Sequence, residues 1–337
     1  MLKIGILGID HRHIYGMYGQ MQALGCVAKG WWTPGQPGTL PGFVERFPDV
    51  PRVDDADALL EDPEIDLILL SGIPADRAAL AIRAMEAGKD VMSDKPGCTT
   101  LDQLDALRMT QQATGRIWSI DFSERFEVPA VTRAAELVAE GAIGQVIQTV
   151  GLGPHRLNRP TRPDWFFDAA RYGGILTDIA SHQIDQFLYF TGAKDADIIT
   201  SAIGNFANPD DAGLQDYGEV LLRAANGASG YIRVDWYTPD ALPTWGDGRL
   251  TILGTEGYIE LRKYVDVGRD GTDHLILANG TRCAHIDASD AGLPYFQRLA
   301  SDIRNRTDTA MSQAHTFKVM ELALKAQAQA TKLGALA

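Results

Sequence analysis

The chain has 337 residues, of which 45% are hydrophobic and 22% are charged, and its formal net charge is −13 at pH 7. This length exceeds what one ordinary hydrophobic core organises, so we expect two domains, each with its own interior. The negative charge argues against nucleic acid and against anionic membrane surfaces as partners, because both would be repelled.

The cysteines and the N-terminal residues bear on whether the protein is disulfide-bonded, metal-binding, secreted or membrane-bound. Cys26, Cys98 and Cys283 are odd in number and widely spaced, which argues against a disulfide framework and a cysteine metal site. We therefore expect three reduced, mostly packed thiols and no metal. The first apolar stretch is interrupted at Asp10 and is too short for a signal peptide, and no later stretch approaches a membrane span. We expect a cytoplasmic enzyme.

Short apolar runs alternate with helical stretches over residues 1–121, which is typical of β-α-β units. A helix over residues 75–87 ends at Gly88, where glycine suits a left-handed helix end. The next helix begins after Thr100, with Gln103 in the capping-box position, and ends at Gly115. The strands, apolar throughout as buried parallel strands should be, are predicted at residues 3–7, 27–31, 66–70, 90–93 and 117–120. This pattern predicts a doubly wound parallel sheet.

The rhythm changes over residues 122–337. Helices are predicted at residues 128–140, 175–191 and 314–333, with a series of strands between the last two. Asn226-Gly227 and Asn279-Gly280 predict hairpins with type I′ turns, in which both central residues have positive φ. Residues 254–257 predict another tight turn. The second domain is therefore predicted to be α+β, with a largely antiparallel sheet and helices on one face.

A glycine-containing turn follows the first strand, where a sheet of this kind would hold the pyrophosphate of a dinucleotide. Of the pattern G-x-G-x-x-G only Gly8 is present, because Asp10 and His13 occupy the positions of the later glycines. Many such turns bind nothing, and a carboxylate beside a pyrophosphate is repulsive. Thr33, after the second strand, suits a ribose or a 2′-phosphate, so NAD and NADP stay open.

Three side chains form a chemically complete set for oxidising an alcohol with a nicotinamide cofactor. Lys95, before a proline at the carboxyl edge of the fourth strand, can direct its ammonium into the crevice and stabilise an alkoxide. Asp178 and His182 lie four residues apart on one predicted helix. His182 can accept the proton, and Asp178 can orient the His182 ring. Singly, each is more typical of a surface lysine or a solvated helix face, and only the combination favours catalysis.

These residues resemble the glucose–fructose oxidoreductase / inositol dehydrogenase (Gfo/Idh/MocA) family. Asp94-Lys95-Pro96 is similar to the E-K-P motif of the family, and residues 173–182, with Asp178 and His182, match its G-G-x-x-x-D-x-x-x-H motif. The resemblance implies a Rossmann-like NAD(P)-binding domain over residues 1–121 and an open-faced domain over residues 122–337. It also implies NAD or NADP in the crevice, a substrate between the domains, and a homodimer or homotetramer built on the second sheet.

The resemblance makes Lys95, Asp178 and His182 catalytic. The cofactor would contact Gly8, Ile9, Asp10, His11, Thr33, Ser71, Asp94 and Lys95. The substrate, a sugar, cyclitol or sugar acid, would contact Arg125, His155, Arg156, Trp165 and Tyr172, because aromatic rings beside hydrogen-bond donors suit a polyhydroxylated ring. These arginines would equally suit ion pairs with acids of the chain. Two alternatives remain open: net elimination or hydrolysis with retained NAD, and a cofactor or sugar sensor without turnover.

Overall fold

The computed structural model describes residues 1–334, so the last three residues assigned to the second domain lie outside the described part. The chain divides into two compact units. The first contains Met1–Asp121, Pro163–Gly173 and Pro294–Met320, and the second contains Phe122–Arg162, Gly174–Leu293 and the chain from Glu321 onward. Within residues 1–334, no helix has both the length and the apolar character that crossing a membrane requires.

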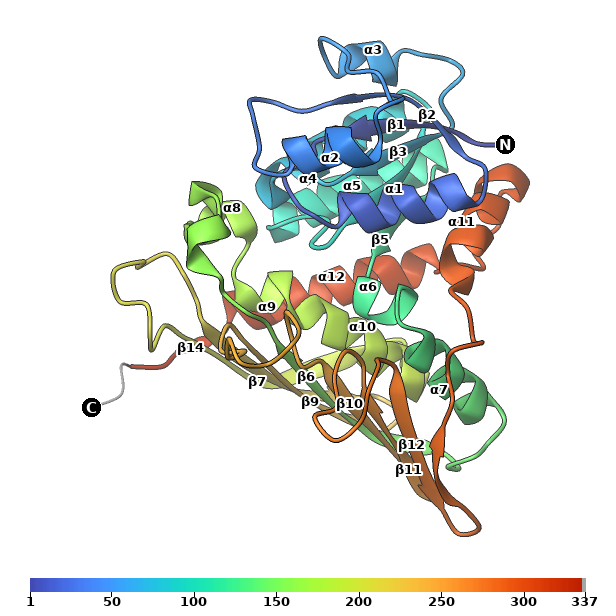
Figure 1. Ribbon diagram of the computed structural model, residues 1–337, viewed down its shortest axis with the longest axis vertical. Helices are drawn as coiled ribbons and strands as arrows, with labels where there is room; N and C mark the ends of the chain where they lie inside the picture. Colours follow the sequence, from blue (N-terminus) through green and yellow to red (C-terminus); the bar gives the residue numbers. More distant parts are fainter. Residues whose placement is uncertain (335–337) are drawn as a thin grey trace. The chain divides into compact units, whose positions relative to one another are not determined.

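A five-stranded parallel sheet forms the centre of the first unit, in the order β2-β1-β3-β4-β5 (Figure 1). Its strands are β1 (Lys3–Leu7), β2 (Val27–Trp32), β3 (Leu67–Leu70), β4 (Asp90–Asp94) and β5 (Trp118–Asp121). β3, β4 and β5 are buried at every position, as expected for parallel strands that are covered on both faces. The predicted doubly wound sheet is confirmed.

The first five helices of this unit lie between its strands, and the others come from two later segments of the chain. They are α1 (Ile14–Ala23), α2 (Leu40–Arg46), α3 (Asp57–Leu60), α4 (Pro74–Glu86), α5 (Leu101–Thr114), α8 (Ala169–Tyr172) and α11 (Pro294–Asn305), with the 3-10 helix η2 (Asp164–Phe167). From β1 the chain proceeds to β2 on one side and to β3 on the other. The carboxyl ends of β1 and β3 therefore form the switch point at which sheets of this kind bind ligands.

The predicted helix ends of α4 and α5 are confirmed in their main features. Gly88 and Gly115 have φ of 79° and 64°, the left-handed conformation that ends a helix. The N–H of Gln103 donates to Thr100 Oγ1 at 3.1 Å. The Gln103 side chain, however, accepts from the N–H of Thr99 at 2.8 Å, one residue before the position that the capping box implies.

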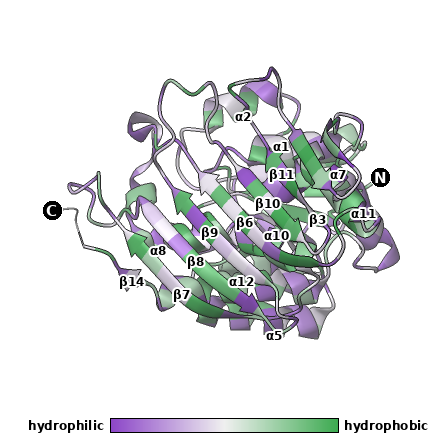
Figure 2. Ribbon diagram, turned by 90° about the horizontal axis from the view of Figure 1, so that it is seen from below, coloured by the Kyte–Doolittle hydropathy of each residue, from purple (hydrophilic) through white to green (hydrophobic). Residues whose placement is uncertain are grey.

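A nine-stranded, mostly antiparallel sheet forms the second unit, in the order β13-β12-β11-β10-β6-β9-β8-β7-β14. α7 (Pro129–Ala139) and α10 (Ala180–Thr191) pack on one face, and Figure 2 shows the strands from the face that these helices leave open. The strands are β6 (Val146–Pro154), β7 (Ala196–Gly204), β8 (Tyr217–Ala224), β9 (Ser229–Asp235), β10 (Arg249–Gly254), β11 (Gly257–Arg262), β12 (His274–Asn279), β13 (Cys283–Ile286) and β14 (Thr331–Lys332). This confirms the predicted α+β class.

Both predicted Asn-Gly hairpins form, but neither has the predicted type I′ turn. In Asn226-Gly227 only the glycine has a positive φ, of 89°, and its N–H donates to Ala224 O at 2.9 Å. This is a type I turn followed by a left-handed glycine. In Asn279-Gly280 neither residue has a positive φ, and the asparagine Oδ1 accepts from the N–H groups of Thr281 and Arg282. Side-chain hydrogen bonds here shape the turn.

Two predicted helices have different bounds. The helix expected at residues 175–191 is interrupted at Ile179, which separates α9 (Ile175–Asp178) from α10 (Ala180–Thr191). At the interruption the His182 N–H donates to Ile179 O at 3.2 Å, a hydrogen bond that spans three residues rather than the four of an α-helix. The last helix, α12 (Gln313–Ala328), ends five residues early because Thr331–Lys332 pairs with β7 as β14.

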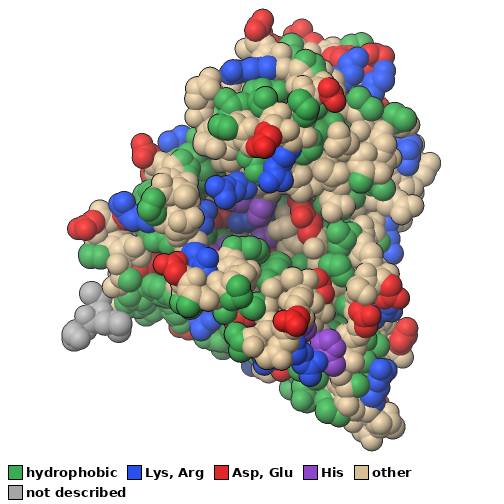
Figure 3. Space-filling model, in the orientation of Figure 1, with side chains coloured by type: hydrophobic (Ala, Val, Ile, Leu, Met, Phe, Trp, Pro, Cys, Tyr) green, Lys and Arg blue, Asp and Glu red, His purple; other side chains and the backbone are tan. Residues whose placement is uncertain are grey.

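The net charge is not gathered into one acidic surface on the face that Figure 3 presents. Acidic and basic side chains are interspersed there, with hydrophobic side chains between them. The overall charge of −13 therefore does not set the local sign of a binding site on this face.

Candidate active site

The β1–α1 turn lies tightly against the end of β3. Gly8 has φ of 76°, and a Cβ on it would lie 2.5 Å from the Cα of Gly72, so only glycine fits. The N–H of Ile9 donates to Thr33 Oγ1 at 3.4 Å, and the N–H of His11 donates to Ser71 O at 3.0 Å. The structure thus brings the predicted cofactor residues together at the carboxyl ends of β1, β2 and β3.

Asp10 places a carboxyl group within this turn. Thr33 Oγ1 donates to Asp10 Oδ2 at 3.4 Å, which holds the carboxyl at the end of β2. Burial raises the pKa of Asp10, and the Thr33 hydrogen bond and the Arg77 charge oppose that rise. Dinucleotide-binding sheets carry an acid at the end of β2 for the adenosine ribose. Here β2 is followed by Thr33 rather than an acid, and the carboxyl at this position comes from Asp10 in the neighbouring turn.

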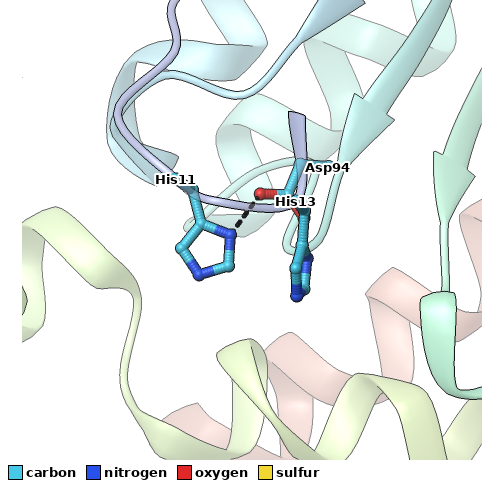
Figure 4. A group of neighbouring side chains, drawn as sticks. All are labelled: His11, His13 and Asp94. Atoms are coloured by element: carbon cyan, nitrogen blue, oxygen red, sulfur yellow. Dashed lines mark hydrogen bonds and ion pairs between the residues drawn. The ribbon is translucent and has the colours of Figure 1, made fainter. Parts of the chain in front are cut away.

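Asp94, the last residue of β4, is completely buried, and four polar side chains surround its carboxylate. Arg77 Nη2 and Ser71 Oγ donate to Oδ2 at 2.9 and 3.2 Å. His11 Nδ1 lies 2.9 Å from Oδ2, and His13 Nδ1 lies 2.8 Å from Oδ1 (Figure 4). Burial alone would raise the pKa of Asp94, but Arg77 and the two imidazoles hold it well below its usual value.

Arg77, which the sequence analysis missed, fixes the turn that carries Lys95. Its Nη1 donates to Lys95 O at 2.6 Å, and it also donates to Asp94 O, Pro96 O and Gly72 O. Lys95 is buried at 3% exposure, and its bond to Pro96 is cis. The helical spacing of Arg77 from Ala81 and Ala84, on the buried face of α4, is a signal that could have identified it.

Burial also decides the charge of His11. It lowers the pKa of His11 to about 4; the Asp94 carboxylate opposes this shift, whereas His13 and Lys95 add to it. The His11 ring is therefore neutral near pH 7. A neutral imidazole contributes a lone pair rather than a positive charge to the site.

The other two predicted catalytic residues lie in the second unit, whereas Lys95 belongs to the first. Asp178 ends α9 and His182 lies in α10, and both are buried, at 8% and 1% exposure. The His182 ring meets Phe122 edge to face, with ring centres 6.2 Å apart. Because the helix is interrupted between Asp178 and His182, their spacing alone does not place them on one face.

A buried ion pair lies close to His182 and was also missed. Lys263 Nζ donates to Glu124 Oε2 at 2.6 Å, and Gln183 Nε2 donates to the same oxygen at 2.9 Å. Burial would raise the pKa of Glu124, but Lys263, His182 and His155 lower it to about 2. The strand glycines Gly151 and Gly153 make room for Gln183, and such glycines in a strand are the available sequence signal.

Of the predicted substrate residues, His155 and Arg156 lie at the end of β6. The His155 ring contacts Trp236 and Trp245, with centroid distances of 5.2 and 4.6 Å. Arg156 Nη2 donates to Pro239 O at 2.8 Å and to Leu242 O, so it holds the loop after β9. His155 thus combines a polar ring with an aromatic wall, while Arg156 has a structural partner.

The other three predicted substrate residues are engaged with different partners. Arg125 forms a two-bond ion pair with Asp185, with both contacts at 2.6 Å and both residues buried. Trp165 and Tyr172 belong to the first unit, where both rings contact Phe166. The five predicted residues are therefore distributed over two units, with Arg125, His155 and Arg156 in the second.

The fold and these clusters define a two-unit α/β protein with a dinucleotide-type sheet edge. The model of the oxidoreductase family with an NAD-binding Rossmann fold matches residues 41–122, and the GFO/IDH/MocA C-terminal domain matches residues 131–260. A crystal structure from Erwinia carotovora atroseptica SCRI1043, described only by the class oxidoreductase, is 45% identical, has a TM-score of 0.96, and covers 99% of this chain and 100% of its own. The chain belongs to the Gfo/Idh/MocA family of oxidoreductases.

Among relatives with named activities, the scyllo-inositol 2-dehydrogenase (NAD(+)) of Bacillus subtilis (strain 168) is 28% identical over 212 residues. That match covers 61% of this chain and spans 58% of the length of the relative. The structure of levoglucosan dehydrogenase in complex with NADH is 20% identical, with a TM-score of 0.74 and 97% coverage of both chains. At this identity the likeness concerns the fold.

Proposed function

We propose that the protein is an NAD(P)-dependent dehydrogenase that transfers a hydride between the cofactor and a secondary hydroxyl of a sugar, a cyclitol or a sugar acid. The observation that carries this proposal is the buried Lys95, which Arg77 fixes at the carboxyl end of β4 in the unit that contains the NAD-binding family match. Membership of a family of oxidoreductases, whose named relatives include dehydrogenases of cyclitols, supports it.

The backbone and polar groups at the carboxyl edge of the parallel sheet suit a dinucleotide. The close approach of Gly8 to Gly72 brings the two backbones together at the switch point, and Asp10 beside Thr33 offers a carboxyl to ribose hydroxyls. Because a carboxylate would repel a 2′-phosphate, we expect NAD to be preferred over NADP. The residues that would hold the cofactor are Gly8, Ile9, Asp10, His11, Thr33, Ser71, Asp94 and Lys95. Bound NAD supplies the hydride acceptor.

The proton and the alkoxide are handled by this chain's own side chains. We assign His182 as acid and base, Asp178 as its orienting partner, and the Lys95 ammonium as the group that stabilises the alkoxide. The Glu124 carboxylate lowers the cost of a positive charge on His182, because its negative charge lies within electrostatic reach. Glu124, Lys263 and Gln183 therefore act as positioning residues.

The substrate would use the aromatic surface of the second unit. His155 between Trp236 and Trp245 presents rings to the C–H faces of a sugar and a nitrogen to its hydroxyls. Arg125 and Arg156 have protein partners, so we assign them to shaping this surface. Residues 1–121 would serve the cofactor, and residues 122–337 the substrate and, through the open sheet face, a homodimer or homotetramer.

To test this proposal, the protein is incubated with a panel of sugars, inositols and sugar acids and with NAD⁺ or NADP⁺. Activity is measured as the increase in absorbance of the reduced nicotinamide. The Lys95→Met variant is expected to lose about 10²–10³-fold in kcat, the usual effect of removing one stabilising donor. Lys194→Met, an exposed lysine, is the matched control and should keep full turnover. Substrate conversion without net reduction of NAD⁺ would instead favour elimination or hydrolysis, and binding without conversion would favour a sensor.

A further inference from the structure

His11, His13 and Asp94 bring two imidazoles and a carboxylate together on the β1–α1 turn and the end of β4 (Figure 4). Hydride transfer, as proposed above, makes no use of the pairing of these two rings. We propose that the three side chains bind one divalent transition metal ion, of which Zn²⁺ is the representative. The proposal does not rest on the dehydrogenase activity.

The spacing of the ligand atoms suits such an ion. One nitrogen or oxygen atom from each residue lies within 4.8 Å of the others, and the two direct contacts to the carboxylate are 2.9 and 2.8 Å. Four-coordinate zinc, with ligands at about 2.0–2.2 Å, separates neighbouring ligand atoms by roughly 3.3 Å. A small outward movement of the two rings would therefore admit the ion.

His11 Nδ1 is the atom of the cluster that most favours a bound ion. His11 Nδ1 is buried and, among residues 1–334, forms no hydrogen bond of good geometry, although it lies 2.9 Å from Asp94 Oδ2. A buried polar atom without a partner is costly. A metal ion between the ring and the carboxylate would give the His11 lone pair a partner.

The surroundings provide an outer shell and a route of entry. Arg77 and Ser71 hold Oδ2 of Asp94, as outer partners commonly hold a ligating carboxylate. The side chains of His11 and His13 are 24% and 30% exposed, so an ion can reach them from solvent. Three protein ligands leave a coordination position open.

The Arg77 charge sets the expected selectivity. Because it already neutralises much of the Asp94 charge, a hard ion such as Mg²⁺ or Ca²⁺, which depends on anionic oxygen, gains little at this site. Imidazole nitrogen suits Zn²⁺, Co²⁺, Ni²⁺ and Cu²⁺. We therefore expect binding of these ions and not of Mg²⁺.

The experiment is calorimetric titration of the chelator-treated full chain with Zn²⁺, together with visible absorption spectra after addition of Co²⁺. The wild type should bind one equivalent. His11→Gln and His13→Gln should each weaken binding by at least about tenfold, the lower end of the effect known for outer-shell partners. His285→Gln is the matched control, because His274 and His285 form another neighbouring pair of rings, 5.6 Å apart.

Circular dichroism of each variant verifies that it is folded, and two independent histidine variants guard against a local folding defect. One equivalent bound by the wild type and by His285→Gln, but lost in both variants of the turn, supports the site. The proposal is overturned if the wild type binds no Zn²⁺ or Co²⁺, if both turn variants bind as the wild type does, or if His285→Gln alone abolishes binding. None of these readouts requires turnover.

Discussion

Two of the buried carboxylates, Asp94 and Glu124, have contrasting surroundings. Asp94 in the first unit is held by a guanidinium, a hydroxyl and two imidazoles, and the side chains of both imidazoles are partly exposed. Glu124 in the second unit is held by an ammonium and an amide, and no member of that group is exposed. The first cluster can therefore still accept a ligand from solvent, whereas the second is closed to solvent and acts electrostatically on its neighbour, His182.

Because of this contrast, we expect substitutions in the two units to change different properties of the protein. Changes near Asp94 should alter the binding of cofactor or ions, and changes near Glu124 should alter stability and the behaviour of His182. The predictions below are arranged from the largest expected effect to the smallest.

The largest effect is expected from His182→Asn. Loss of the acid and base should lower kcat by about 10²–10⁴-fold with little change in NAD⁺ affinity, because His182 lies outside the unit that carries the cofactor residues. Steady-state kinetics on the best substrate of the panel, with His285→Asn as the exposed control, measures it. Unchanged kcat in His182→Asn would remove this residue from the mechanism.

Lys263→Met should destabilise the second unit strongly. It leaves the buried Glu124 carboxylate with a hydrogen bond from the Gln183 amide but no direct ion pair, and breaking a buried pair from one side costs about 3–5 kcal/mol. Urea unfolding measures the loss. The double variant Glu124→Gln with Lys263→Met removes both charges and should recover much of the stability, so a double variant as unstable as the single one contradicts a charge-based explanation.

The same pair predicts a pH dependence of folding. The pKa of Glu124 falls from its usual 4.5 to about 2 in the folded protein. Its contribution to stability is therefore complete above pH 4.5 and is lost as the pH falls towards 2, by up to about 3 kcal/mol. Unfolding free energies measured across this range should fall less steeply in the double variant, and identical slopes would count against the assignment.

Asp10→Asn is expected to have the smallest effect, confined to the choice of cofactor. Removing the carboxylate beside Thr33 removes repulsion of a 2′-phosphate, so the preference for NAD⁺ over NADP⁺ should shrink by about tenfold, equivalent to about 1.4 kcal/mol. Dissociation constants of both cofactors, compared with those of the exposed Asp210→Asn variant, measure the change. A wild type that prefers NADP⁺ would refute the role given to Asp10.

The sequence predicted those features that depend on local pattern. Apolar runs located all five parallel strands, and glycines and Thr100 marked the helix ends, because these signals act over a few residues. Arg77, Glu124 and Lys263 escaped prediction, because their roles depend on partners between 17 and 139 positions away along the chain. The turn types failed for a related reason, since Asn side chains selected geometries that the dipeptide pattern does not specify.

The central claim is that the edge formed by Gly8, Ser71 and Lys95 binds a nicotinamide dinucleotide although its turn carries Asp10 and His13 in place of glycines. Titration of the full chain with NAD⁺ and NADP⁺ in a calorimeter tests it most directly. We expect one bound dinucleotide per chain, held more tightly as NAD⁺, and a severe loss of affinity in Gly8→Val, whose Cβ would lie 2.5 Å from the Cα of Gly72. A wild type that binds neither dinucleotide would contradict it.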